Sequence, residues 1–122
     1  MRVLVCGGRD YSDSPALFRA LDAIDREHGI TCIIHGGASG ADDIAHSWWT
    51  RRYVDRKRPG WFTLAVCRPD WSAAGKAAGP QRNQMMLERG KPDMVLAAPG
   101  GRGTADMVRR AREAGVTVIE VA

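Results

Sequence analysis

The sequence predicts an α/β fold with a doubly wound, parallel, five-stranded sheet. Two observations support this prediction. Short apolar runs alternate with amphipathic helical segments along the chain, and glycine-rich turns follow several of the runs. Alternating strands and helices imply right-handed crossovers, with helices on both faces of the sheet. We expect the strand order 3-2-1-4-5 and a single domain covering residues 1–122.

The individual elements are predicted from apolar runs and from helix start and stop signals. The predicted strands span residues 2–6, 31–35, 61–66, 94–97 and 116–120. The predicted helices begin at Ser14, about Asp42, Pro80 and Thr104, and end at Gly29, before Pro59, at Gly90 and at Gly115. Ser14 and Thr104 are the expected N-caps. Residues 67–79 are expected to form a long polar loop, which in a compact domain is more often functional than idle.

Composition places the chain among ordinary globular proteins, with 44% apolar and 26% charged residues. No apolar run is long enough to span a bilayer, and the first apolar run is too short for a signal peptide. We therefore expect a cytoplasmic protein without membrane contact. Cys6, Cys32 and Cys67 are odd in number and lack C-x-x-C spacing. They are interpreted as reduced packing residues, and neither a metal nor a cofactor is predicted.

A glycine-rich turn at residues 99–106, PGGRGTAD, links a predicted strand to a predicted helix. Glycine leaves no Cβ to obstruct a ligand near the backbone, and free N–H groups at a helix start attract anions. The turn can therefore hold a phosphate. The alternative is a strand-to-helix turn that uses glycine only for its geometry.

Two further glycine-rich turns lie at the same predicted edge of the sheet, at residues 6–10 and 36–40. In a sheet of order 3-2-1-4-5 the winding reverses between the first and fourth strands, and ligands bind outside the carboxyl ends of the strands there. Three such turns on one edge favour a phosphate-bearing ligand. The spacing is neither G-x-G-x-x-G nor G-x-x-x-x-G-K-[ST], so NAD chemistry and P-loop hydrolysis are unsupported.

The net charge of +4 favours anionic partners. Much of it comes from the basic run at residues 51–58, near Trp48, Trp49 and Trp61. Such a cluster can bind nucleic acid by stacking and charge, although a solvated helix end is the more common explanation. The paired tryptophans can equally provide a face for a homodimer or a larger homo-oligomer.

Four motifs in order resemble one known family: CGGRDY at 6–11, HGGASGAD at 35–42, GKAAGPQRN at 75–83 and PGGRGTAD at 99–106. The chain resembles the YspA/YpsA-related branch of the SLOG superfamily, formerly a domain of unknown function. The resemblance covers nearly the whole length. It implies a Rossmann-like fold that binds nucleotides or nucleotide-derived small molecules.

The superfamily also contains the LOG phosphoribohydrolases and the DNA-processing protein DprA. The LOG enzymes pair an arginine, matched here by Arg82, with a glutamate in Pro-Gly-Gly-x-Gly-Thr-x-x-Glu. The glutamate position is Met107, and a thioether can neither take a proton nor stabilise an oxocarbenium-like sugar. Asp106 is the nearest substitute, about 100° around the helix. Arg82 and Asp106 are therefore the candidate catalytic pair.

Three functions follow: binding of a nucleotide-derived phosphate ligand, as a sensor or sequestering module; LOG-like hydrolysis of nucleoside monophosphates; and DprA-like nucleic-acid binding. Asp10 and Asp42 are candidates for ribose hydroxyls or, equally, for turn formation and helix capping. His35 and His46 are interpreted as structural. The predicted ligand-binding residues are Gly7, Gly8, Arg9, Asp10, Gly36, Gly37, Ala38, Gly40, Asp42, Lys76, Arg82, Asn83, Pro99, Gly100, Gly101, Arg102, Gly103 and Thr104.

Overall fold

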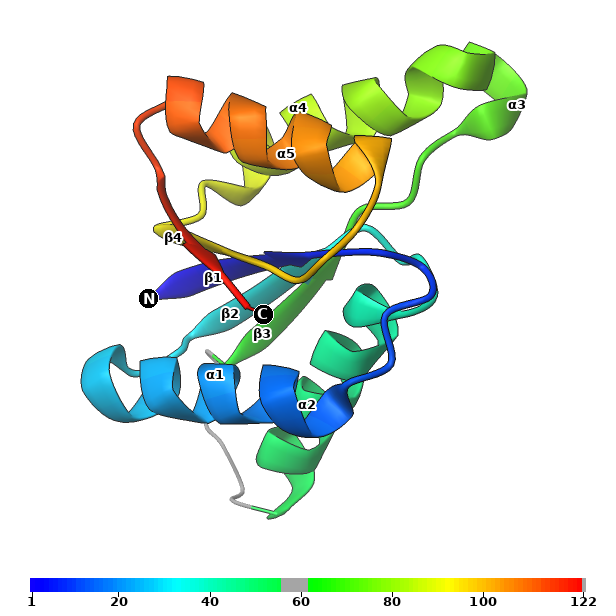
Figure 1. Ribbon diagram of the computed structural model, residues 1–122. Helices are drawn as coiled ribbons and strands as arrows, with labels where there is room; N and C mark the ends of the chain where they lie inside the picture. Colours follow the sequence, from blue (N-terminus) through cyan, green and yellow to red (C-terminus); the bar gives the residue numbers. More distant parts are fainter. Residues whose placement is uncertain (56–61, 122) are drawn as a thin grey trace.

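Five parallel strands form one sheet in the order β3-β2-β1-β4-β5, which confirms the prediction. The computed structural model describes residues 1–55 and 62–121 (Figure 1). The strands are β1 (Arg2–Cys6), β2 (Cys32–His35), β3 (Thr63–Val66), β4 (Met94–Ala97) and β5 (Thr117–Glu120). The expected start of the third strand at Trp61 lies outside the described residues.

The central strand β1 lies between β2 and β4, with Leu4 opposite both Ile34 and Val95. At its end, Cys6 pairs with Ala97 of β4. Because the strands are parallel, the turns that follow β1, β2 and β4 leave the sheet at one edge. The winding reverses at this edge, between β1 and β4.

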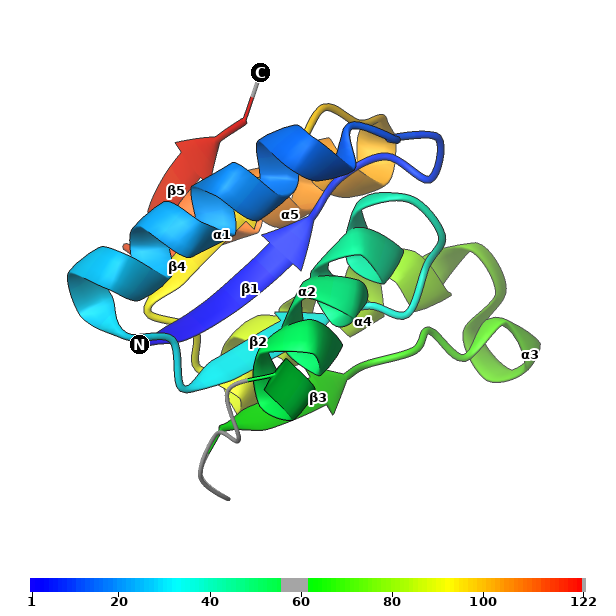
Figure 2. The ribbon, with the colours of Figure 1, turned by 90° about the horizontal axis from the view of Figure 1, so that it is seen from below.

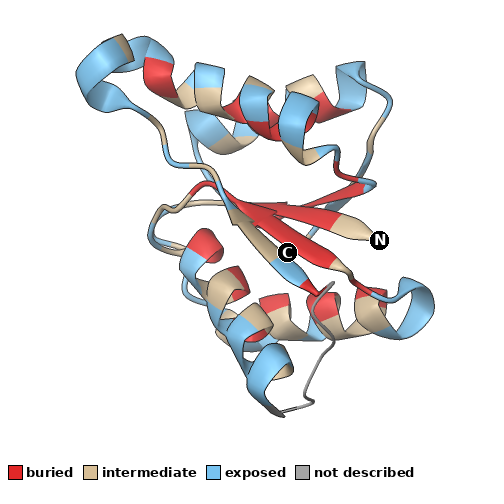
Figure 3. Ribbon diagram, turned by 180° about the vertical axis from the view of Figure 1, so that it is seen from behind, coloured by how far each residue is buried: buried red, intermediate tan, exposed pale blue. Residues whose placement is uncertain are grey.

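Helices cover both faces of the sheet. The helices α1 (Ser14–His28) and α2 (Ala41–Asp55) cover one face, and α4 (Ala78–Gly90) and α5 (Arg102–Glu113) cover the other (Figures 1 and 2). Successive β1 residues belong to different cores because side chains alternate along a strand. Val3 and Val5 belong to the core that contains Trp48 of α2, and Leu4 to the core that contains Met107 of α5. In Figure 3 the buried residues lie along the strands and on the helix sides that face the sheet.

The segment predicted as a long polar loop contains two short helical elements, and that prediction was wrong. The helix α3 (Trp71–Ala74) and a 3₁₀-helix, η1 (Gly75–Ala77), lead into α4 at Ala78, two residues before Pro80. The Asp70 carboxylate accepts a hydrogen bond from the Ala73 amide at 3.1 Å and so caps α3. Four helical residues carry no periodic pattern, so only this cap could have signalled the helix.

Both predicted N-caps were also wrong. Asp13, not Ser14, caps α1 and accepts a hydrogen bond from Ala16 N at 3.1 Å. The helix α5 begins at Arg102, and no side chain caps it. Thr104 instead lies inside the first turn of α5. None of the described helices has both the length and the apolar character needed to cross a membrane.

Candidate functional site

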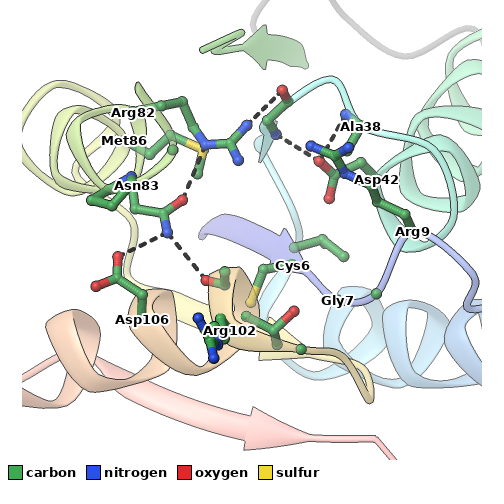
Figure 4. A pocket seen from close by; sticks show the side chains of 18 of the residues that line it. Cys6, Gly7, Arg9, Ala38, Asp42, Arg82, Asn83, Met86, Arg102 and Asp106 are labelled. Carbon is green, nitrogen blue, oxygen red and sulfur yellow. Dashed lines mark hydrogen bonds between the residues drawn. The ribbon is translucent and has the colours of Figure 1, made fainter. Parts of the chain in front are cut away.

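A cavity of about 710 Å³ lies at the edge where the sheet reverses its winding, between the turns after β1, β2 and β4 and the helix α4 (Figure 4). We call it the main cavity. The predicted residues that line it are Gly7, Gly8, Arg9, Gly36, Ala38, Asp42, Lys76, Arg82, Asn83, Gly101, Arg102, Gly103, Thr104 and Asp106. Turns far apart in the sequence therefore share one concave surface, within the size range of small-molecule sites.

Backbone hydrogen bonds join the three turns to one another. Gly8 N donates to Pro99 O at 2.9 Å, and Ala41 N donates to Gly8 O at 3.3 Å. A Cβ on Gly40 would lie 2.1 Å from Gly8 O, and Gly40 has φ of +76°. Glycine at position 40 therefore serves backbone packing between turns, and Gly40 does not line the main cavity.

The turn after β2 is satisfied by the chain's own carboxylate. Asp42 Oδ2 accepts hydrogen bonds from Gly36 N and Ala38 N, both at 3.1 Å (Figure 4). Asp42 is 6% exposed, and its burial raises the pKa of the carboxyl, an effect that these hydrogen bonds and Arg82 oppose. The carboxylate thus engages two amides that would otherwise be free to donate to an anion.

The turn after β4 is different, because its helix begins without a side-chain cap. Within the described part of the chain, the amides of Arg102, Gly103 and Thr104 have no hydrogen-bond acceptor. These residues line the main cavity, as does Gly101. Free amides together with the helix dipole form an environment that favours an anion.

Two neighbouring residues of α4 connect the opposite walls of the main cavity. Arg82 Nη1 donates to Gly36 O at 2.7 Å, and Arg82 Nε donates to Asn83 Oδ1 at 3.0 Å. Asn83 Nδ2 donates to Gly103 O at 3.2 Å and to Asp106 Oδ2 at 3.0 Å (Figure 4). Asn83 is buried, so its amide fixes α4 against the start of α5.

Asp106 lines the cavity, but both of its carboxylate oxygens are engaged. Arg109 Nη2 donates to Oδ1 at 2.9 Å, and Arg110 Nε donates to Oδ2 at 2.8 Å. Partial burial disfavours the charged carboxylate, but the hydrogen bonds from Asn83 and these arginines outweigh it and lower the pKa of Asp106. A carboxylate with a lowered pKa is a weak proton acceptor at neutral pH.

Two further residues bear on catalysis. Met107, at the glutamate position of the LOG motif, is 1% exposed and packs in the core, so it does not reach the cavity surface. Cys6 lines the cavity, but burial and then the charge of Asp42 raise the pKa of its thiol to about 12. A thiol with this pKa stays protonated and is a poor nucleophile.

Sequence reasoning missed several lining residues. Trp71 of α3 lines the main cavity with half of its surface exposed, and Met86 and Val5 line it as well. Within the described chain, four basic side chains line the cavity: Arg9, Lys76, Arg82 and Arg102. Asp42 and Asp106 are its acidic members, and both are hydrogen-bonded within the protein. An aromatic residue in a polar segment was the available signal for Trp71.

The remaining predicted residues lie elsewhere. Gly37 lines a smaller neighbouring cavity of about 320 Å³, and Asp10 is exposed outside both cavities. Pro99 and Gly100 line a separate hollow beside α5. In this hollow Arg109 Nη1 lies 3.1 Å from Glu113 Oε1. In the same hollow Arg112 Nη2 lies 3.8 Å from Glu120 Oε1. The charged side chains of that hollow are thus paired within the chain.

The predicted nucleic-acid surface is partly used by the fold itself. Trp48 is buried and donates from Nε1 to Asp22 Oδ1 at 2.9 Å, while Arg52 forms an ion pair with Asp22. Trp49 stacks on Phe62 with ring centroids 5.5 Å apart. Residues 56–58 of the basic run and Trp61 lie outside the described residues.

The His35 and His46 side chains form a pair, with His35 Nε2 2.9 Å from His46 Nδ1. Gly37 N donates to His35 Nδ1 at 2.9 Å, which places the His35 proton on Nε2. Burial, followed by the charges of His46 and Arg68, lowers the pKa of His35 to about 4. Among residues 1–55 and 62–121 no three His, Cys, Asp or Glu side chains gather closely enough to hold a metal ion.

Comparison with known proteins gives two matches. Residues 1–73 match the family described as YAcAr, the YspA, cpYpsA-related SLOG family. The chain is also 41% identical to the Gene 61 protein of Mycobacterium phage D29, an alignment that covers 97% of this chain and 94% of the phage protein. The family match includes the turns after β1 and β2, and the phage protein extends the similarity through α4 and the turn after β4. The chain belongs to the YspA, cpYpsA-related SLOG family.

Proposed function

We propose that the protein binds a nucleotide or a nucleotide-derived phosphate compound in the main cavity. The observation that carries the proposal is the uncapped start of α5, whose free amides line a cavity together with Arg9, Lys76 and Arg102. Backbone amides at a helix start and basic side chains together bind phosphate groups. Membership of the SLOG family supports the same class of ligand.

Two lining residues favour a ligand with a nucleobase over a bare phosphate. Trp71 offers a half-exposed indole to the cavity, and the buried thioether Met86 lines the same cavity. Base stacking on an aromatic side chain contributes about 1–3 kcal/mol per base. The phosphate is assigned to the α5 end and the base to Trp71.

Nucleoside monophosphates of the four common bases test this function, with ribose 5-phosphate as the ligand without a base. We expect at least one monophosphate to raise the melting temperature, because a ligand at 100 times its Kd stabilises the folded state by about 2.7 kcal/mol. Arg102→Gln should weaken binding about tenfold, the loss of one charge-assisted contact. Arg102 is exposed at the start of α5, so its replacement should leave the fold intact.

Arg89→Gln is the matched control, since Arg89 is exposed on α4 and lines neither cavity. If neither these compounds nor the corresponding nucleoside diphosphates and 3′,5′-bisphosphates alter the melting temperature at millimolar concentration, the proposal is wrong. Equal losses for Arg102→Gln and Arg89→Gln would place the binding outside the main cavity.

Hydrolysis of nucleoside monophosphates is the second candidate, favoured by the presence of Arg82 and Asp106 in the lining of the same cavity. Here the ionised Asp106 would stabilise positive charge on the sugar rather than transfer a proton. Incubation with monophosphates, followed by chromatography for the free base, tests this role. Activity that survives both Arg82→Ala and Asp106→Asn would exclude the assigned pair.

A further inference from the structure

A second, smaller cavity adjoins the main cavity on the side of the turn after β2. It has a volume of about 320 Å³ and is lined by Arg9, Arg82 and Trp71, which it shares with the main cavity, and by Arg68, which the main cavity lacks. We call it the side cavity. Because the two cavities share lining residues, one ligand can occupy both.

All charged side chains of the described residues that line the side cavity are positive. Its lining contains the guanidinium groups of Arg9, Arg68 and Arg82, and no Asp or Glu of the described residues lines it. Like charges that gather at one place repel one another unless an anion lies between them. The Asp42 carboxylate is nearby, but it is turned onto the amides of Gly36 and Ala38.

Two of the three arginines are held by consecutive carbonyl groups of the turn after β2. Arg82 Nη1 donates to Gly36 O at 2.7 Å, and Arg68 Nη1 donates to Gly37 O at 3.0 Å. Both guanidiniums lie against glycine: a Cβ on Gly36 would be 1.9 Å from Arg82 Nη1, and one on Gly37 would be 2.9 Å from Arg68 Nη1. The backbone therefore positions both groups before any ligand arrives.

Each guanidinium has five N–H donors, so these carbonyl contacts leave further N–H groups for a ligand. Planar guanidinium groups bind phosphate oxygens in pairs and are suited to a multiply charged oxyanion. We infer that the side cavity is a second anion subsite, so that the ligand of the protein carries two anionic groups, one at the α5 end and one among Arg9, Arg68 and Arg82. This inference rests on the proposed function and specifies its ligand class.

Two kinds of nucleotide carry such a pair of groups: a nucleoside diphosphate, with adjacent phosphates, and a nucleoside 3′,5′-bisphosphate, with phosphates at separate positions. Calorimetric titration compares both with the monophosphate of the same base. We expect one of them to bind at least about tenfold more tightly than the monophosphate, which corresponds to one additional charge-assisted interaction. The preferred one reports how far apart the two anion subsites lie.

Arg68→Gln is the decisive variant because Arg68 lines only the side cavity. It should remove the gain from the second phosphate and leave the affinity for the monophosphate unchanged within about twofold, whereas Arg89→Gln should alter neither. If monophosphates bind but a second phosphate brings no gain, or if the gain persists in Arg68→Gln, the inference fails while the proposed function stands. If no nucleotide binds, the proposed function fails.

A measurement without nucleotides tests the side cavity directly. Arg68 and Arg89 are both exposed, so phenylglyoxal, which modifies arginine, should label both. Inorganic pyrophosphate should protect Arg68 and not Arg89 when the labelled peptides are quantified by mass spectrometry. Equal labelling of Arg68 with and without pyrophosphate would contradict the second subsite.

Discussion

The turns after β2 and β4 have similar sequences, HGGASGAD and PGGRGTAD. They differ in which of their backbone amides have a hydrogen-bond acceptor within the protein. In the turn after β2, Asp42 Oδ2 occupies the amides of Gly36 and Ala38, and His35 accepts from Gly37 N. In the turn after β4, the first amides of α5 have no acceptor in the described chain. The turn amides of Gly36, Gly37 and Ala38 are thus engaged by the protein, whereas the first amides of α5 are free. We call the turn after β2 the closed turn and the turn after β4 the open turn.

The difference arises from where the helix begins relative to the acidic residue. Asp42 is the second residue of α2, close enough to reach back to the turn. Asp106 occupies the equivalent place in the sequence motif, but α5 begins at Arg102, four residues before Asp106. The Asp106 carboxylate therefore lies along the helix, where it pairs with Arg109 and Arg110. A glycine-rich turn alone therefore does not predict an anion site.

Gly40→Ala should have the largest effect on stability. Its Cβ would lie 2.1 Å from Gly8 O in a left-handed backbone conformation, so steric overlap and backbone strain together should cost about 4 kcal/mol. Chemical denaturation measures the loss. Gly103→Ala is the control from the open turn: no atom lies within 4 Å of its Cβ, and alanine in a helix should stabilise by about 0.5 kcal/mol. Similar losses for both variants would contradict the difference between the turns.

Acid should weaken the closed turn more than the open one. Since the pKa of His35 is about 4 in the fold and 6.5 when unfolded, the unfolded state binds more protons between these values. The free energy of unfolding is therefore unaffected by His35 above pH 6.5 and decreases as the pH falls toward 4, by up to about 3 kcal/mol.

Denaturation at a series of pH values, compared with His35→Asn, isolates this contribution, because Asn retains an acceptor but does not titrate. The raised pKa of Asp42 acts in the opposite direction, and it is common to both proteins. The exposed His28 provides a control as His28→Asn. Identical pH profiles for wild type and His35→Asn would show that His35 does not carry the acid sensitivity.

Asp42→Ala should open the closed turn at a smaller cost. Two amides lose their acceptor, but the cost of burying the Asp42 carboxylate, which its raised pKa reflects, is removed as well. We therefore expect the free energy of unfolding to fall by about 2 kcal/mol. Inorganic phosphate should then raise the melting temperature of the variant more than that of the wild type. Asp43→Ala replaces the exposed neighbour and is the control. It should lower the free energy of unfolding by no more than about 1 kcal/mol and should not increase the response to phosphate. A phosphate response no greater than that of wild type would show that the freed amides do not bind an anion.

The sequence predicted the sheet and its order because apolar runs and glycine turns record the alternation of strands and helices directly. It also predicted which turns share an edge, since parallel strands end on the same side. The short helix α3, the cap at Asp13 and the uncapped start of α5 at Arg102 were missed. Helix starts depend on one local hydrogen bond, and several nearby polar residues can supply it.

For the site, the sequence by itself determined that Arg82, Asn83 and the glycine turns belong to one region, because the motifs fix their places on elements that meet at the sheet edge. Only the tertiary structure decided which amides are free, that Asp106 is held by Arg109 and Arg110, and that Arg68 and Trp71 border the cavities. Such facts depend on hydrogen bonds and contacts between residues distant in the chain. A pattern of residue types along the sequence does not specify them.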